Sequence, residues 1–279
     1  MREDYGIHVF DDWNISRRTE PWVKGPDDLV KLPFILQKPA EWQLDEWRHD
    51  AQRAVEYARK HELLTMVRRT ITSDATQWFC EIPWFMMQLY DDSGFVQEFL
   101  SIFEEVALWQ TEVALELKPD VFQHRGWYDA PNFWGIEHFA EYVLPFIKRH
   151  VQMVHEADIL HCYLLTQGWS SYLDLFQSLP TDILWGADPV QVGTTLETLK
   201  NELGSPKVIL GGISSEQHLS GCSTEITRKG TREAIAALAP GGGFILASGS
   251  SIWSACTWAN IAAMISEAHS SGSYPINVS

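Results

Sequence analysis

The sequence has few cysteines and no long apolar run. Four cysteines in 279 residues are too sparse for a disulfide framework, so we expect reduced thiols at Cys80, Cys162, Cys222 and Cys256. No stretch approaches the roughly 20 apolar residues that a membrane-spanning helix needs, and the first residues contain no apolar core of a signal peptide. We therefore expect a cytoplasmic protein that does not bind a membrane.

Positive charge is scarce as well. The formal net charge is −16, and the pairs Arg17-Arg18 and Arg68-Arg69 are too short to make a stripe that binds a polyanion. Nucleic acid is therefore not an expected partner, and the acidity favours a solvated surface. A docking face for a basic partner is the alternative interpretation, and no motif supports it.

Linker-like segments are also missing. No stretch rich in proline, serine or glycine divides the sequence, and a single (β/α) barrel typically takes roughly 250 residues. We therefore expect one domain over residues 1–279, with an irregular N-terminal segment at residues 1–43.

A regular alternation of short apolar strands and amphipathic helices is present. The expected strands are at 63–67, 120–123, 158–163, 182–186, 207–211 and 243–247. The expected helices are at 44–62, 78–91 (as two short pieces), 95–117, 136–156, 171–179, 194–203, 224–238 and 257–270, with a kink at Pro145. Parallel neighbours need crossover helices, so this pattern predicts a parallel sheet, closed as a barrel or open and doubly wound.

Polar residues stand where three of these strands are expected to end. His161 is placed near the end of the strand at 158–163, Asp188 follows the strand at 182–186, and His124 and Arg125 follow the strand at 120–123. Barrel enzymes keep their chemistry at the carboxyl ends of strands, so these are candidate acid–base groups, with His124-Arg125 suited to an acidic substrate. A core histidine or a turn aspartate is the structural alternative.

The adjacent Cys162 raises the question of zinc. Successive strand residues point to opposite faces, so His161 and Cys162 cannot readily bind one metal ion. Zinc needs at least three protein ligands, and the other thiols of the C-terminal half are Cys222 and Cys256. We expect no metal site and interpret the thiols as small core residues.

Several segments resemble the uroporphyrinogen decarboxylase superfamily. In order they are HFAEYVLPF at 138–146, ILHC at 159–162, VILGGI at 208–213, LSG at 219–221, PGGGFIL at 240–246 and ANIAAM at 259–264. The resemblance covers residues 120–275 and is weaker before them. It implies an α/β fold, the distorted (β/α)8 TIM-type barrel, expected to be incomplete at the N-terminus because six strands are counted instead of eight.

Members of this superfamily are uroporphyrinogen decarboxylases or methyltransferases that work with corrinoid proteins. The arginine-rich N-terminal substrate loop of the decarboxylases has no counterpart in this sequence. Zinc-binding relatives carry a His-x-Cys pair and a later cysteine, whereas this chain has Tyr163 after His161-Cys162 and Gly249-Ser250-Ser251 in the later region. The resemblance therefore implies a methyltransferase-like member without zinc.

The leading hypothesis is a methyltransferase that moves a methyl group between a small-molecule donor or acceptor and a corrinoid (cobalamin) co-substrate on a partner protein. His161 would orient or protonate the leaving group. The expected site residues are His161, Asp188 and His124 for catalysis and Arg125, Tyr163, Ser250 and Asn260 for substrate binding. The alternatives are a uroporphyrinogen decarboxylase and a truncated barrel that binds without turnover; a homodimer is one assembly considered.

Overall fold

The computed structural model describes residues 7–9, 16–18, 20–70, 72–249, 251–274 and 276. The chain forms two compact units. Unit 1 comprises Met1–Asp129 and Phe133–Leu160, and unit 2 comprises Ala130–Asn132 and His161–Ser279. The single domain expected over residues 1–279 stays a prediction.

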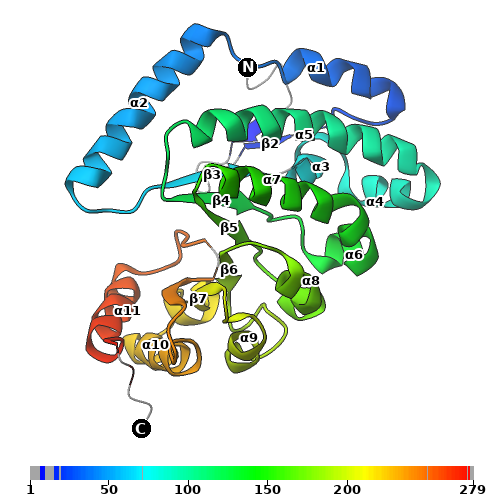
Figure 1. The fold of residues 1–279 in the computed structure, drawn as a ribbon. Coiled ribbons are helices and arrows are strands. Elements are labelled where there is room, and N and C mark those ends of the chain that lie inside the picture. Colours follow the sequence, from blue (N-terminus) through cyan, green and yellow to red (C-terminus); the bar gives the residue numbers. More distant parts are fainter. Residues whose placement is uncertain are drawn as a thin grey trace. The chain divides into compact units, whose positions relative to one another are not determined.

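Unit 1 contains two parallel strands, β3 (Met66–Thr70) and β4 (Val121–Arg125), and two long helices, α5 (Ser93–Leu115) and α7 (Leu144–Glu156) (Figure 1). The strand β4 and these helices share an apolar cluster that includes Phe122, Ala114 and Val154, with Val67 of β3 packed against it. The other elements of unit 1 are β1 (Ile7–Val9), β2 (Ser16–Arg18), η1 (Pro26–Lys31), α1 (Leu32–Ile35), α2 (Glu41–Lys60), η2 (Thr72–Asp74), α3 (Ala75–Phe79), α4 (Ile82–Asp91), α6 (Pro131–His138, whose first two residues belong to unit 2) and η3 (Phe139–Val143).

Local sequence signals set the ends of α5. The Asp92 side chain accepts a hydrogen bond from the backbone N–H of Phe95 at 3.0 Å, which satisfies one of the free donors at the start of the helix. After the helix, Lys118 takes a positive φ of 48°, and Pro119 cannot continue it. Both signals agree with the predicted helix at 95–117.

Phenylalanines from three helices form the aromatic core of unit 1. Phe95, Phe99 and Phe103 lie on one face of α5, and Phe99 packs against Phe85 of α4 with ring centroids 5.1 Å apart. Phe103 in turn contacts Phe79 of α3 at 4.7 Å. Burying each ring stabilises the fold by about 1.5–3 kcal/mol, so this face fixes the short helices α3 and α4 against α5.

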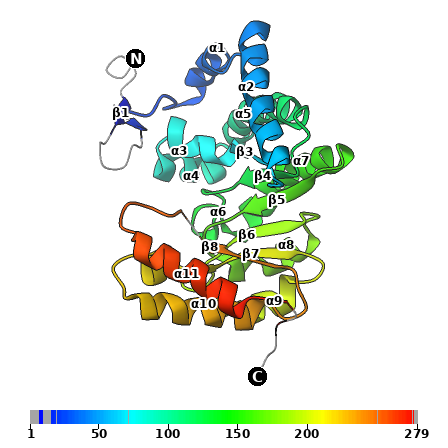
Figure 2. The ribbon, with the colours of Figure 1, turned by 90° about the vertical axis from the view of Figure 1, so that its left-hand side faces the viewer.

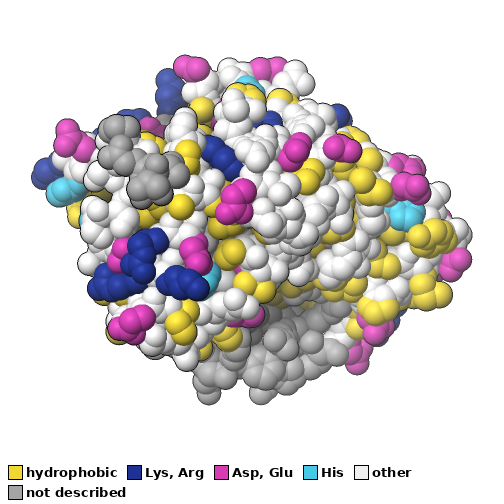
Figure 3. Space-filling view, turned by 90° about the horizontal axis from the view of Figure 1, so that it is seen from below, with side chains coloured by type: hydrophobic (Ala, Val, Ile, Leu, Met, Phe, Trp, Pro, Cys, Tyr) yellow, Lys and Arg dark blue, Asp and Glu magenta, His cyan; other side chains and the backbone are white. Residues whose placement is uncertain are grey.

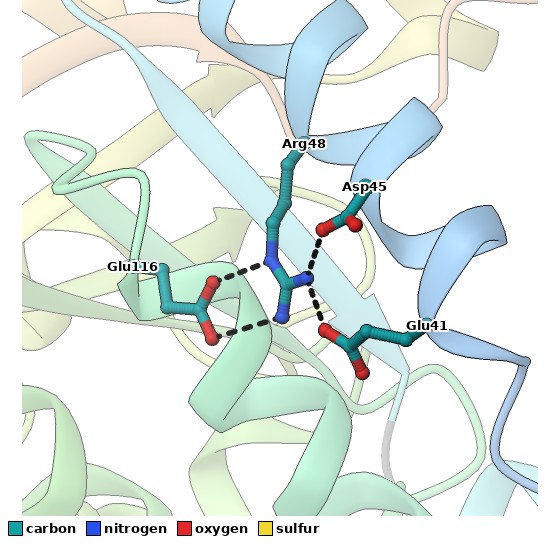
Figure 4. Close-up of polar contacts among 4 residues, drawn as sticks. All are labelled: Glu41, Asp45, Arg48 and Glu116. Atoms are coloured by element: carbon teal, nitrogen blue, oxygen red, sulfur yellow. Dashed lines mark hydrogen bonds and ion pairs between the residues drawn. The ribbon is translucent and has the colours of Figure 1, made fainter.

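Helix α2 is attached to the end of α5 by charged side chains (Figure 4). The Nε atom of Arg48 lies 2.7 Å from the Glu116 carboxylate, and its Nη1 atom lies 2.6 Å from Glu41 and 2.8 Å from Asp45. Glu41 and Asp45 belong to α2 itself, whereas Glu116 caps α5. The guanidinium therefore joins two helices that are distant in sequence.

The helix predicted at 136–156 is interrupted. Helix α6 contains Gly135 with φ 63°, and a π-helical turn, η3, separates α6 from α7. Pro145 occupies the first turn of α7, where its missing N–H removes no internal hydrogen bond. A π turn therefore lies directly before the Leu144-Pro145 step, while the backbone leaves helical angles at Gly135, so the kink expected at Pro145 stays a prediction.

Unit 2 contains the parallel strands β5 (Leu160–Leu164, whose first residue belongs to unit 1), β6 (Ile183–Ala187), β7 (Val208–Ile213) and β8 (Phe244–Ser248). They pair in chain order, with Cys162 opposite Ile183 and Ile209 opposite Phe244. Helix α10 packs on β7 and lies beside α11 (Figure 2). The remaining elements are η4 (Trp169–Tyr172), α8 (Leu173–Ser178), α9 (Leu196–Leu203), η5 (Ser215–Leu219), α10 (Thr224–Leu238) and α11 (Trp258–Ser271).

Six parallel strands alternating with helices confirm the predicted α/β class and are consistent with an incomplete TIM-type barrel. In unit 2 the order of the strands never reverses, as it would at the switch point of a doubly wound sheet. The predicted strands agree with the observed ones to within about three residues, the usual error of sequence-based boundaries.

Charged side chains of both signs share the surface. On the face drawn in Figure 3, the main group of Lys and Arg side chains is compact and has acidic side chains beside it. Within the described part of the chain, no helix is both long enough and apolar enough to cross a membrane.

Candidate functional site

In unit 2, the carboxyl ends of three parallel strands bring polar groups together. Strands β6, β7 and β8 are followed by Asp188, Ser214 and Gly249, and β8 itself ends at Ser248. The hydroxyls of Ser215 and Ser248 lie 2.6 Å apart. Side chains at this position of parallel strands form the active sites of barrel enzymes, so we take this cluster as the candidate site.

Asp188 supplies the carboxyl group of the cluster and is buried, with 1% of its surface exposed. Its Oδ1 atom accepts a hydrogen bond from the backbone N–H of Val190 at 2.8 Å, while Oδ2 makes no hydrogen bond to any described residue. Burial raises the pKa of Asp188, and the Val190 amide and the Ser214 side chain partly oppose that rise. Asp188 can therefore hold a proton at higher pH than an ordinary aspartate.

Close packing fixes the Asp188 backbone. A Cβ atom added at Gly249 would lie 2.6 Å from the Cα and Cβ atoms of Asp188, so only glycine fits at this point after β8. The Gly249 N–H also donates to the Ile213 carbonyl at 2.8 Å, and the Trp185 indole donates to the Ser248 carbonyl at 3.1 Å. These bonds hold the ends of β6, β7 and β8 in one arrangement.

His218 supports the turn after β7. Its Nδ1 atom accepts from the backbone N–H of Ser214 at 3.1 Å, which places the proton of the neutral ring on Nε2. The ring lies against Gly230 of α10, where an added Cβ would be 2.8 Å from Nε2. Burial lowers the pKa of His218, against the opposing charges of Asp188 and Glu233. His218 is therefore a neutral residue that positions Ser214.

Unit 1 has a second polar cluster where β3 and β4 end. Asp74 is fully buried, accepts from the Tyr128 backbone N–H at 3.1 Å, and lies 3.3 Å from the Arg125 guanidinium. Burial raises the pKa of Asp74 to about 6 although Arg125 lowers it. Arg125 also lies over the Trp127 ring, 4.8 Å from its centroid. The cation proposed for an acidic substrate is thus already engaged by a carboxyl group.

His161 does not stand at the carboxyl end of its strand, and this expectation is wrong. It is the second residue of β5, its Nδ1 atom lies 2.8 Å from the Thr181 hydroxyl, and its backbone N–H donates to Asp182. Thr181 and Asp182 precede β6 and so mark the amino ends of the strands.

The separation of His161 from Asp188 follows from the register. Leu164 lies opposite Trp185, so His161 is three residues before this pair and Asp188 is three residues after it. The two residues therefore lie at opposite ends of neighbouring strands and do not share one strand end.

The side chains of His124 and Tyr163 point toward the helices that cover the strands. The His124 ring packs against His150 of α7, with centroids 5.4 Å apart. Tyr163 is completely buried against Phe176 of α8 at 5.8 Å. Both rings therefore lie in the layer between strands and helices, and their contact with substrate stays a prediction.

The side-chain amide of Asn260 is engaged in hydrogen bonds within the fold. Its Nδ2 atom donates to the carbonyls of Leu219 at 3.2 Å and Cys222 at 3.1 Å, which ties α11 to the loop before α10. Ser250 lies outside the described residues. Among the predicted site residues of unit 2 that the structure describes, only Asp188 is found in the candidate cluster.

Sequence reasoning missed Ser214, Ser248 and His218. A signal was present, since Ser214 precedes the turn at 215–219 and its hydroxyl accepts from the Gln217 N–H in the manner of a helix cap. For metals, the described residues include no group of three or more His, Cys, Asp or Glu that could hold an ion. The expectation that zinc is absent stays a prediction.

No curated protein matches the sequence. Among solved structures, a methyltransferase from Methanosarcina mazei matches with a TM-score of 0.68 and 13% identity, over 80% of this chain and 64% of the methyltransferase. A B12-independent methionine synthase from Shewanella sp. W3-18-1 matches with a TM-score of 0.56 and 10% identity, over 84% of this chain and 67% of the synthase. This chain thus spans less than two thirds of the methyltransferase, and the likeness shows the fold.

The family-level comparison covers the part of the chain that carries both the predicted motifs and the candidate cluster. The model of the family described as uroporphyrinogen decarboxylase (URO-D) matches residues 81–271, more than half of the 279 residues. The chain belongs to the uroporphyrinogen decarboxylase family.

Proposed function

We propose that this chain is a methyl-transfer enzyme of the family, which moves a methyl group between a small-molecule donor and a corrinoid held by a partner protein. The buried Asp188 carboxyl at the carboxyl end of β6 carries the proposal, because its raised pKa suits it to exchange a proton with a leaving group. A methyltransferase among the similar structures supports it at the level of the fold.

The chemistry needs one proton at a defined place. When a methyl group leaves a methoxy or methylamine-like donor, the bond between carbon and heteroatom breaks, and the heteroatom keeps the electron pair. A proton on Asp188 Oδ2, the oxygen without a hydrogen bond among the described residues, would neutralise that heteroatom. The hydroxyls of Ser214, Ser215 and Ser248 would orient the donor, with Ser214 positioned by His218.

The corrinoid is assigned to a partner protein and not to this chain. This assignment rests on the family resemblance, whose methyltransferase members work with corrinoid proteins. When bound, the corrinoid would supply the methyl-accepting centre. This chain would contribute donor binding, orientation and the proton.

Decarboxylation of uroporphyrinogen is the rival activity. A substrate with many carboxylates requires cations that are free to pair with them, whereas Arg125 is already paired with Asp74 at 3.3 Å. The decarboxylase therefore ranks second, and the non-catalytic barrel third.

One experiment separates the three. The purified chain is incubated with uroporphyrinogen III in one tube, and with cob(I)alamin and a panel of methanol, methylamine and methoxyaromatic donors in another. We expect the cobalamin absorbance to change in the second tube with at least one donor. Coproporphyrinogen in the first tube alone would reverse the ranking, and inactivity in both would favour the binding barrel.

Variants test the role of Asp188 in the active tube. Asp188→Asn keeps the shape but cannot supply the proton, so we expect methyl transfer to fall by about 100-fold or more, the usual contribution of general acid catalysis. The matched control Asp174→Asn, on the exposed side of α8, should retain full activity. Equal rates for both variants would remove Asp188 from the mechanism.

A further inference from the structure

Unit 1 contains a groove that the proposed methyl transfer does not use. It lies between helix α2, strand β3 and helix α5, and its volume is about 630 Å³. This size is within the range of about 300–1,000 Å³ that small-molecule sites occupy. All of its lining residues belong to unit 1.

The walls of the groove are mainly apolar and include two indoles. Trp47 of α2 and Trp109 of α5 line it together with aliphatic residues such as Val55 and Val113. Trp47 keeps 41% of its surface exposed, although tryptophan in a protein without a ligand usually buries more. Exposed indoles beside aliphatic side chains provide a binding surface for a flat or aliphatic body.

The charge of the groove is opposite to that of the chain. Its described lining residues include two arginines, Arg68 and Arg69, and no Asp or Glu, whereas the whole chain carries a net charge of −16. The Nε atom of Arg69 is buried and has no hydrogen-bond partner in the described structure. Burial also lowers the pKa of Arg69, and no acidic group among the described residues opposes this shift.

Arg69 is half-buried and faces no acid among the described lining residues, and a desolvated cation without an acid is costly unless a ligand supplies the anion. Arg48 joins α2 to the end of α5 through Glu116 at 2.7 Å, a bond that helps to hold these two walls of the groove together (Figure 4). Walls that are joined in this way lose less entropy when a ligand binds.

We propose that this groove binds a small amphipathic monoanion, with a carboxylate or sulfonate head on Arg69 and an apolar body between Trp47 and Trp109. The positive charge of Arg69 selects an anionic head group, because an oxyanion can accept two hydrogen bonds from one guanidinium. The apolar walls select a ligand with an apolar body. Small hydrophilic anions such as acetate or phosphate have no such body and are therefore excluded as ligands.

A matched pair of dyes tests the proposal. The anionic dye 8-anilinonaphthalene-1-sulfonate and the neutral N-phenyl-1-naphthylamine share one aromatic body, and both fluoresce when they leave water. We expect Arg69→Gln to weaken binding of the anionic dye at least tenfold, which corresponds to about 1.4 kcal/mol, and to leave the neutral dye unchanged. Arg69→Lys should keep part of the affinity for the anion.

Two further variants make the result specific. Ala51→Trp fills the groove from α2 and should abolish binding of both dyes, while Arg53→Gln, on the exposed side of the same helix, should change neither. Thermal melts confirm that each variant is folded. Equal loss of both dyes in Arg69→Gln would overturn the charge argument. Unchanged binding in Ala51→Trp, or a dimer in which the groove no longer takes either dye, would overturn the site.

Discussion

Asp74 should make the stability of this protein depend on pH in a direction opposite to that of most aspartates. The carboxyl is fully buried, and burial raises its pKa from 3.8 to about 6 although Arg125 and the backbone N–H groups of Tyr128 and Trp127 stabilise the charged form. A raised pKa means that the folded state binds the proton more tightly than the unfolded state. The folded state is therefore favoured at low pH and loses that advantage as the pH rises through 6.

The magnitude follows from the size of the shift. A rise of about 2 units corresponds to about 3 kcal/mol in full, at 1.36 kcal/mol per unit. Between about pH 4.5 and about pH 7.5 roughly 2 kcal/mol of this should be lost, because part of the change occurs at lower pH. Asp74→Asn does not titrate, so the variant should gain about 2 kcal/mol relative to the unmodified protein over this interval.

Urea unfolding at a series of pH values measures this difference directly. A constant offset between variant and unmodified protein reports lost contacts, and only the pH-dependent part reports the titration. Arg125→Gln should steepen the dependence, since removing the countercharge raises the pKa of Asp74 further. The double variant should show no such dependence. A difference between Asp74→Asn and the unmodified protein that stays constant across the series would refute the argument.

Two predictions concern packing. Gly249→Ala should destabilise the protein by about 1–3 kcal/mol in urea unfolding, because the new Cβ would lie 2.6 Å from the Asp188 backbone, whereas Gly25→Ala, with nothing within 4 Å, should change little. Phe99→Ala should cost about 3–5 kcal/mol, because the ring is completely buried, and the control Phe34→Ala, on a ring that is 75% exposed, should be nearly neutral. Equal effects within either pair would contradict the packing described for these residues.

The helices and strands could be predicted because their signals are local. The helix expected at 224–238 matches α10, since Ser223 precedes its first turn and Pro240 follows its end. The alternation of short apolar strands with helices was enough to predict parallel pairing, because each crossover needs a helix. The family resemblance added the barrel, which periodicity alone left open.

The candidate site could be predicted only in part. Asp188 was found because it follows its strand directly, and a strand end is a local feature. His161 was misplaced because the strand begins at Leu160 and not at residue 158, so a residue expected near the end of the strand is the second residue of the real one. A boundary error of two residues thus moved a side chain from one end of the strand to the other.

The sequence by itself determined the class of fold, the order of its elements and the family, because propensity, periodicity and motif are encoded in neighbouring residues. Only the tertiary structure decided which side chains meet. Ser215 contacts Ser248, 33 residues later in the chain, and Arg125 contacts Asp74, 51 residues earlier. The groove is lined by Arg69 together with residues of α2, which precedes β3 in the sequence, and of α5, which follows it. Such contacts depend on strand register and on where the helices pack, and burial sets their energies. Neither the register nor the burial can be derived from a local sequence pattern.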